Sequence, residues 1–238
     1  MHVDAEIAAL RTLIEAQTAR INDLEFELGL LQDKDEILRL QYCYGYFMDN
    51  RMFAEMVDLF ADHDPWMEIG GRGRYEGKKH IHDFLLHVLG NGRWGLLPDE
   101  VINHVQQQLL IDVDPDRQRA RARGRAEVQG NSPPATPTFL FADGIYENTY
   151  VREDGRWKIQ GLTVTMTYYA ALQRERISFP SAPPSVELPP DRPSQPVVAA
   201  LGRQFNPWHF KHPITGRELP IPASQTGPPT MGHSNGRS

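Results

Sequence analysis

The stretch from Phe139 to Thr165 constrains the fold most strongly, because it reads as two long strands joined by a short turn. Both runs are rich in β-branched and aromatic residues, and Arg152-Glu-Asp-Gly separates them. Asp-Gly between two alternating runs is a strong local signal for a β-hairpin. We therefore predict an antiparallel hairpin here and expect the rest of the chain to pack around it.

The first strand of this hairpin has one face that is polar and aromatic. Successive side chains of a strand point to opposite faces, so Gly144, Tyr146, Asn148 and Tyr150 share one face. A plain core would carry aliphatic residues at these positions. The pattern leaves two interpretations open, a solvated face or a concave sheet that lines a pocket.

Hydrophobic residues recur every seven positions near the N-terminus. The two series are Ile7, Ile14, Ile21 and Leu28, and Leu10, Gln17, Leu24 and Leu31. A sustained heptad is typical of a coiled coil, and a single polar core residue such as Gln17 often sets its register. We expect residues 1–32 to form an oligomerisation helix. A helix that packs on its own domain is the alternative.

Residues 33–170 are expected to form one α+β domain. Acidic residues at Asp33–Glu36 predict the start of a new helix. The further predicted elements are helices at 36–50, 53–60 and 78–89, and strands at 65–69, 101–113 and 119–128. Together with the hairpin, this order predicts a curved sheet folded around helices.

The composition changes after Ala171. Most of the 19 prolines lie from Pro180 onward, so we expect residues 171–238 to form an arm that cannot bury a core of its own. The cluster Phe205-Asn-Pro-Trp-His-Phe is aromatic enough to dock on the domain. Beyond about Gln225 the arm is expected to be disordered.

Charge and composition exclude several classes of function. The net charge of −6 gives no electrostatic reason to expect a nucleic-acid partner. The chain has one cysteine, Cys43, which we interpret as buried and inert, and no apolar run near the ~20 residues that span a membrane. We therefore expect a cytoplasmic protein that makes no membrane contact.

No motif for a cofactor or metal stands out. The glycine-rich Gly70-Gly-Arg-Gly does not follow the strand-to-helix phosphate pattern. His80 and His82 are two apart on a predicted helix, so they point in different directions and make a poor metal pair. Alternating arginines at 119, 121, 123 and 125 fit a solvated or subunit-facing side better than an anion site.

Four stretches resemble the nuclear transport factor 2-like superfamily, in particular its SnoaL-like and scytalone-dehydratase-like branch. They are YGYFMDNRMFAEMVDL from Tyr44, Tyr75-Glu-Gly, Val101-Ile-Asn-His104, and DGRWKIQGL from Asp154. The resemblance covers about residues 33–169. It implies a cone-shaped fold, a strongly bent mixed or antiparallel sheet wrapped over helices, with a pocket inside.

The resemblance also implies an acid–base site. Enzymes of this branch use an aspartate at the end of the long helix and a histidine on a central strand, and Asp49 and His104 match these positions. A carboxylate that orients an imidazole and stabilises its charged form makes histidine a competent base near neutral pH. The resemblance to scytalone dehydratases favours a homotrimer, whereas the heptad residues favour a dimer by coiled-coil rules. We expect the trimer.

Several other side chains are candidates for the pocket. We expect Tyr44 and Tyr146 to assist catalysis. The residues expected to contact substrate are Tyr46, Trp66, Glu68 and Asn148. The alternative for the aromatic residues is core packing, and for Glu68 an exposed position.

The chain differs from scytalone dehydratases at positions where those enzymes carry functional side chains. Met48 replaces a tyrosine, no histidine lies near Gln129–Asn131, and Gly144 and Tyr146 stand where a serine and an asparagine are expected. These differences argue against scytalone itself as the substrate.

The layout, including the Pro-rich arm, resembles SnoaL-like lyases of bacterial aromatic catabolism. These include lyases that release formaldehyde from lignin-derived diarylpropanes. The expected function is a cofactor-independent lyase for a hydroxylated aromatic molecule, with deformylation to a stilbene as the specific reaction. A dehydratase, isomerase or cyclase of a phenolic or polyketide substrate is the alternative, as is a non-catalytic binding or assembly module.

Overall fold

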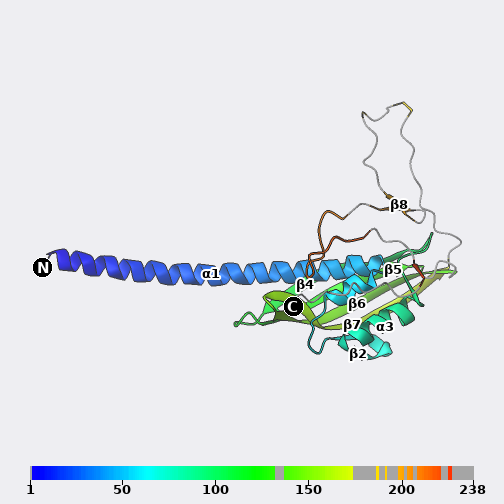
Figure 1. The fold of residues 1–238 in the computed structure, drawn as a ribbon, viewed down its shortest axis with the longest axis horizontal. Helices are drawn as coiled ribbons and strands as arrows, with labels where there is room; N and C mark the ends of the chain where they lie inside the picture. Colours follow the sequence, from blue (N-terminus) through cyan, green and yellow to red (C-terminus); the bar gives the residue numbers. More distant parts are fainter. Residues whose placement is uncertain are drawn as a thin grey trace, which may run out of the picture.

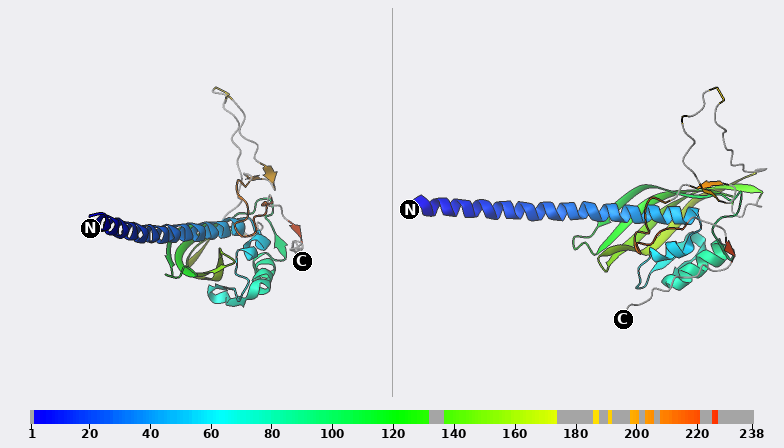
Figure 2. Two further views of the ribbon diagram at one scale, coloured as in Figure 1. Left: turned by 60° about the vertical axis from the view of Figure 1, so that its left-hand side comes forward. Right: turned by 45° about the horizontal axis from the view of Figure 1, so that its top comes forward.

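One long helix dominates the shape of the molecule. The computed structural model describes residues 2–131, 137–173, 186–187, 191, 198–200, 203–205, 208–220 and 225–226. Helix α1 runs without interruption from His2 to Asp49. Its N-terminal half projects from the domain as a stalk (Figures 1 and 2). The predicted helix start at Asp33 is therefore wrong. The Asp33 carboxylate does not cap a helix but accepts hydrogen bonds from the domain.

The remainder of the described chain forms an α+β domain around a six-stranded sheet of order β2-β1-β7-β6-β5-β4. The strands are β1 Trp66–Ile69, β2 Arg74–Glu76, β4 Ile102–Val113, β5 Arg119–Gly130, β6 Thr138–Glu153 and β7 Arg156–Gln173. All neighbours pair antiparallel except β1 with β7, which is parallel. The predicted curved mixed sheet is confirmed.

The predicted hairpin is the pair β6–β7. Glu153 pairs with Arg156, which leaves Asp154 and Gly155 as a two-residue turn. Both residues have positive φ, 51° and 75°, the conformation that Asp-Gly adopts most readily in hairpins. The pairing register shifts between Asp143 and Gly144 and between Thr149 and Tyr150, and at both points β7 carries one extra residue, Thr167 and Gln160, so that these bulges bend β7.

Helices fill the concave side of the sheet (Figure 2). They are the C-terminal half of α1, α2 Phe53–Asp58, and α3 Gly77–Asp83, which continues as a π-helix, η2, over Phe84–Leu89. The short elements are η1 Gly70–Arg72, β3 Arg93–Trp94, β8 Val198–Ala200, β9 Arg203–Phe205 and β10 Gln225–Thr226. Among the described helices, none is both long and apolar enough to span a membrane.

The polar and aromatic face of β6 lies inside the cone. Tyr146, Asn148 and Tyr150 are buried, whereas Glu147 between them is exposed. On β5 the alanines face inward and the alternating arginines face outward, where Arg119, Arg121 and Arg123 are exposed. Of the two interpretations of the hairpin face, the concave one is therefore confirmed.

A buried ionic cluster fixes the point where α1 leaves the domain. Asp33, 1% exposed, accepts hydrogen bonds from Arg117 Nε at 2.6 Å and Trp157 Nε1 at 3.1 Å, and it pairs with Arg152. A side chain at Gly29 would clash, since its Cβ would lie 2.1 Å from Arg117 Nη1. Glycine at this position lets Arg117 cross the helix and reach Asp33.

The aromatic part of the C-terminal arm docks on the outer side of α1. Trp208 makes edge contacts with Tyr46 and Phe47 at 6.1 and 6.3 Å between ring centroids. His212, 1% exposed, stacks on Phe47. The docking predicted for this cluster is confirmed for its described part, whereas the predictions for most of 174–238 lie outside the described residues.

Candidate active site

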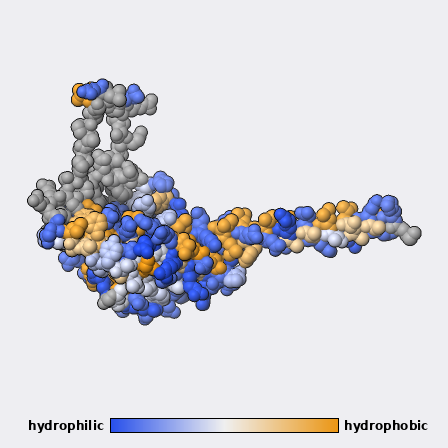
Figure 3. Space-filling view, turned by 180° about the vertical axis from the view of Figure 1, so that it is seen from behind, coloured by the Kyte–Doolittle hydropathy of each residue, from blue (hydrophilic) through white to orange (hydrophobic). Residues whose placement is uncertain are grey.

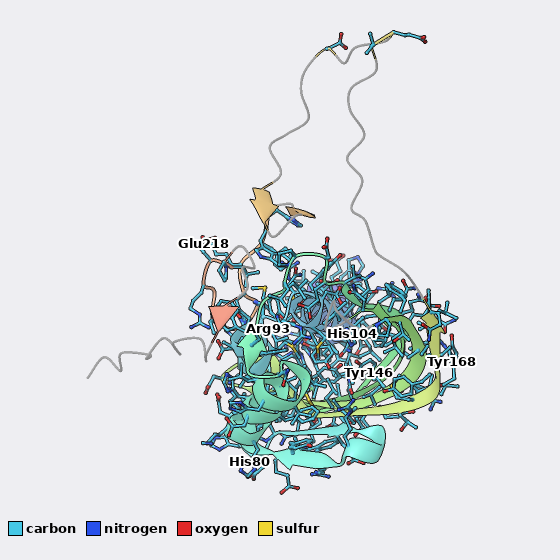
Figure 4. All side chains as sticks on the ribbon, turned by 90° about the vertical axis from the view of Figure 1, so that its right-hand side faces the viewer. His80, Arg93, His104, Tyr146, Tyr168 and Glu218 are labelled. Carbon is cyan, nitrogen blue, oxygen red and sulfur yellow. The ribbon has the colours of Figure 1, made fainter. Side chains whose placement is uncertain are left out.

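The sheet and helices enclose a cavity of about 630 Å³. It lies between the end of α1, the η2–β3 segment and the concave faces of β4–β7. Its walls are mostly apolar, and the polar side chains on the sheet and α1 include His104, Tyr44 and Tyr146. In Figure 4, His104 and Tyr146 lie inside the curved sheet, whereas His80 lies at the edge of the domain. A mostly apolar cavity with a few convergent polar groups is typical of a small-molecule site.

Asp49 and His104 meet at the wall of this cavity, although they are 55 residues apart in the chain. Asp49 is the last residue of α1, and His104 follows the start of β4. Asp49 Oδ1 accepts the backbone N–H of His104 at 2.5 Å and lies 3.7 Å from His104 Nδ1. The carboxylate therefore anchors the strand and faces the imidazole at ion-pair distance.

The buried Nδ1 atom of His104 has no hydrogen-bond partner among the described residues. A small rotation of either side chain would bring Nδ1 into hydrogen-bond distance of the Asp49 carboxylate. Catalytic hydrogen bonds are often long before substrate binds and tighten in the complex. The pair is thus placed to hold a proton on Nδ1 and leave Nε2 as the basic atom.

Two tyrosines stand beside the pair. Tyr44 on α1 and Tyr146 on β6 are buried, their rings make an edge contact at 6.0 Å, and a hydrogen bond joins their hydroxyls. Burial raises the pKa of Tyr44 well above its usual range, with further contributions from Tyr146 and the charge of Asp49. Burial likewise raises the pKa of Tyr146. Both phenols are therefore protonated near neutral pH and can donate a hydrogen bond or a proton.

Trp66 and Glu68 do not line the cavity, which corrects the expectation that they contact substrate there. Side chains alternate along β1, and Met67 between them is fully buried. Trp66 and Glu68 consequently point to the other face. The Trp66 indole lies against Gly161, where a Cβ would come within 2.1 Å of it, and the Arg74 guanidinium stacks on its other side at 4.2 Å.

Tyr46 and Asn148 are also outside the cavity lining. Tyr46 lies on the outer side of α1, is 53% exposed and contacts Trp208. Asn148 does face the concave side, but α1 covers it there: its amide donates to Gln41 Oε1 at 3.0 Å. The helix fills this part of the cone, so the cavity extends over only part of the concave surface. The docked aromatic cluster likewise packs on α1 and does not form a cavity wall.

Three arginines of the cavity were not predicted from the sequence. Arg51, Arg72 and Arg93 line it, and Glu100 binds two of them. Arg51 follows Asp49 by two residues, and a charged residue so close to the end of a buried helix was the available signal. Arg93 lies in the two-residue strand β3 and Glu100 in the loop that follows it, and no local pattern predicts their convergence.

Other parts of the described chain show fewer features of a site. A groove of about 550 Å³ lies on the outer face of β5–β7, but its histidine, His63, is exposed. Burial raises the pKa of the Cys43 thiol to about 11, so this thiol is protonated near neutral pH. Among the described residues, no cluster of three or more His, Cys, Asp or Glu could hold a metal ion.

A sequence profile of the SnoaL-like domain matches residues 30–163. This match covers more than half of the chain, and the chain belongs to the SnoaL-like domain family. A sequence comparison with curated proteins found no match. The suspected membership of the SnoaL-like branch is therefore confirmed.

Three solved structures illustrate the likeness of this fold to known proteins. A hexachlorocyclohexane dehydrochlorinase, LinA type 2, is 22% identical, with 66% of this chain and 99% of that chain covered at a TM-score of 0.56. For LinA type 3 from Novosphingobium barchaimii the identity is 21%, the coverages 65% and 99%, and the TM-score 0.55. A protein of Novosphingobium aromaticivorans assigned as a scytalone dehydratase is 20% identical, with coverages of 61% and 91% and a TM-score of 0.50. At these identities the likeness establishes the fold.

Proposed function

We propose that this protein is a cofactor-independent lyase that acts by acid–base chemistry on a hydroxylated aromatic small molecule. The observation that carries the proposal is the Asp49–His104 pair, 3.7 Å apart at the wall of a largely apolar cavity. Two protonated tyrosines lie beside it. A base, acids and an apolar enclosure are what an elimination without a cofactor requires.

His104 serves as the general base in this proposal, and Asp49 orients it. Proton transfer to Nε2 creates an imidazolium, whose charge the Asp49 carboxylate stabilises across the ion-pair distance. The same carboxylate holds the His104 backbone N–H, which fixes the position of the strand relative to α1. The position of His104 relative to Asp49 is thus set before substrate binds.

The specific reaction we propose is deformylation of a diarylpropane diol. Tyr44 or Tyr146 donates a proton to the benzylic hydroxyl, which leaves as water, while a para-phenol releases its proton to solvent and becomes a quinone methide. The tyrosinate regains a proton from solvent after turnover. His104 then removes the hydroxyl proton of the neighbouring hydroxymethyl group. The C–C bond breaks, formaldehyde leaves, and the electron pair restores the aromatic phenolate, which gives a stilbene. The reaction is redox-neutral and needs no co-reactant.

Incubation with a para-hydroxylated diarylpropane diol tests the proposal by parallel assays of formaldehyde and stilbene. We expect equal amounts of the two products. His104→Ala should lower turnover on the order of 10³-fold, because general-base catalysis contributes about 10²–10⁴-fold. Asp49→Asn should lower it about 10²-fold. His80→Ala, which changes an exposed histidine outside the cavity, is the matched control.

Other results would redirect or refute the proposal. Release of water without formaldehyde would identify a dehydratase, which needs only the first half of the sequence. Binding of the diol without turnover would identify a binding module. Undiminished turnover in His104→Ala would remove His104 as the base.

We also propose that the stalk assembles the protein as a homotrimer. The isoleucine and leucine side chains at the heptad positions of residues 7–31 are 45–65% exposed in the single chain. Figure 3 shows hydrophobic surface along the stalk. A second and third copy of the same helix would cover this seam, since heptad faces are self-complementary.

A further inference from the structure

A second charged group lines the same cavity, on the side of η2 and β3. Glu100 is fully buried and lies between two arginines. Arg51 Nη2 lies 2.9 Å from Glu100 Oε1, and Arg93 binds both carboxylate oxygens at 3.3 Å. Two cations thus share one anion, and both cations line the cavity. Figure 4 shows Arg93 on the helix side, apart from the position of His104 and Tyr146.

The positive charge of this group is little exposed to water. The side chains of Arg51 and Arg93 are 4% and 15% exposed. Three of the described residues that line the cavity are arginines, the third being the exposed Arg72, and the Asp49 carboxylate at the opposite group accepts the His104 backbone N–H. A cation held in a mostly apolar cavity interacts strongly with an anion that enters it, because the effective dielectric constant is low.

The pKa of Arg51 is consistent with a buried positive charge beside a second cation. Burial lowers the pKa of the Arg51 guanidinium, Glu100 raises it, and the charge of Arg93 lowers it again. The net pKa is lowered, so burial and the neighbouring cation outweigh the contact with Glu100.

Backbone contacts hold the group in place. Arg51 Nη1 donates to the carbonyl of Leu89 at 2.9 Å, and Arg93 Nη1 donates to the carbonyl of Gly95 at 3.2 Å. Glu100 accepts the backbone N–H of Leu97 at 2.8 Å. The guanidinium groups are therefore preorganised, and little side-chain entropy is lost when they bind a ligand.

We propose that Arg51 and Arg93 bind an oxyanion of the aromatic substrate, a carboxylate or a phenolate, while His104 acts on another part of the same molecule. This inference rests on the proposed function for its assignment of an aromatic ligand. Guanidinium groups suit such oxygens because their N–H donors are planar and permanently charged. The site therefore selects aromatic acids or ionised phenols over neutral aromatic molecules of the same shape.

Calorimetric binding of two unreactive probes tests the carboxylate form. The probes are a stilbene with one para-carboxylate and the matched para-carboxamide. We expect the carboxylate to bind about 10- to 100-fold more tightly, the range given by hydrogen bonds to charged groups. Arg93→Gln should abolish this preference and leave carboxamide binding unchanged, and Arg93→Lys should restore part of it. Arg119→Gln, an exposed arginine on the outer face, is the matched control.

A spectroscopic titration tests the phenolate form. Para-nitrophenol absorbs at longer wavelength when ionised, so its apparent pKa can be followed in the presence of the protein. Binding at the arginine pair should lower that pKa, and Arg93→Gln should remove the shift. A carboxylate preference or a phenol shift that depends on Arg93 supports the proposal and identifies which oxyanion is bound.

Equal affinity for carboxylate and carboxamide, together with an unshifted para-nitrophenol pKa, would overturn the inference. An equal loss of both ligands in Arg93→Gln would do the same, because it would indicate a structural role only. Since the probes do not react, these results are independent of turnover. A protein that prefers the carboxylate but cleaves no diol would refute the proposed reaction and leave the oxyanion site intact.

Discussion

The two halves of helix α1 share the same backbone geometry but have different surroundings. From residue 2 to residue 28 every described side chain is exposed, whereas from Gly29 to Asp49 one face is buried in the domain. The stalk repeats its apolar residues every seven positions, while the domain half buries positions spaced at three and four residues, such as Ile37, Leu40, Gln41 and Tyr44. The first spacing suits a partner helix that supercoils with it, and the second suits a fixed wall of a single domain.

This difference separates the proposed assembly from the proposed catalysis along one helix. An isolated helix gains little stability in water without tertiary contacts. The domain half is stabilised by the cone and ends at Asp49, whose carboxylate reaches the candidate base. The stalk has no such support within the described chain, and the proposed trimer would supply it. Four predictions test this division, beginning with the largest expected effect.

Charged residues in the stalk seam should dissociate the oligomer completely. In Ile14→Asp with Ile21→Asp, each chain would bury two carboxylates at every helix contact, at a cost that exceeds the gain from the remaining heptads. Light scattering of the full-length variant should give the mass of one chain. Thr12→Asp with Ala19→Asp adds the same charge off the seam and should leave the oligomer intact. A native chain that is already monomeric would contradict the prediction.

Loss of the Asp33 charge should destabilise the domain half without affecting the stalk. Asp33→Asn leaves Arg117 and Arg152 without their buried counter-charge, and we expect a loss of about 3 kcal/mol in the free energy of unfolding. Urea denaturation measures this loss, and light scattering should show an unchanged oligomer. Substitution of the exposed Asp35 by Asn is the control.

The loss of stability in Asp33→Asn should depend on pH. Burial alone would raise the pKa of Asp33, but hydrogen bonds from Arg117 and Trp157 and the charge of Arg152 outweigh it, so the pKa is lowered from 3.8. The stabilisation is therefore complete above that ordinary value and is lost as the pH falls through the lowered one. The stability difference between native protein and Asp33→Asn should shrink on acidification. A constant difference down to low pH would contradict the assignment.

Replacement of Gln17 by Leu should strengthen the assembly and weaken its specificity. Burial of a leucine in the seam should add about 1–2 kcal/mol per chain, since the polar residue sets register at a cost in stability. Thermal unfolding at several protein concentrations measures the gain, and light scattering reports any change in the number of chains. Unaltered stability and mass would place Gln17 outside the helix contact.

Protonation of His212 should loosen the docked arm by a smaller amount. Its Nε2 lies 2.9 Å from the Glu55 carbonyl, and its Nδ1 accepts the N–H groups of Ile214 and Thr215 at 3.1 Å, so a second proton has no acceptor. Burial is the main cause of its pKa being lowered from 6.5. The contribution of His212 is present above that value and is lost as the pH falls below it.

Thermal unfolding between about pH 8 and pH 5 should therefore show a loss of about 1 kcal/mol or less that His212→Gln abolishes. His209→Gln, at the exposed neighbouring histidine, should behave like the native chain. The comparison also isolates the contact of the arm with Phe47 in the domain half of α1. An identical pH dependence in native protein and His212→Gln would refute this role.

Local sequence determined most elements of this protein, although it did not reveal that α1 continues through Asp33. The heptads, the Asp-Gly turn and the alternation around Tyr146 depend on residues a few positions apart, and backbone geometry translates such spacings directly into helices, turns and strand faces. The position of Asp49 at the end of a helix and of His104 near the start of a strand was predictable for the same reason, together with the family resemblance.

Tertiary structure decided which faces meet. Alternation on β1 separates Met67 from Trp66 and Glu68, but the packing of the sheet selects which of them is inside, and here Met67 is buried. α1 covers Asn148 and leaves Tyr44 at the cavity, although both residues face the interior of the cone. Arg51 follows the end of α1, Arg93 lies in β3 and Glu100 in the loop after it, and no periodicity links them. Such contacts depend on the relative placement of distant segments, which is fixed by the packing of the whole core and by no local spacing.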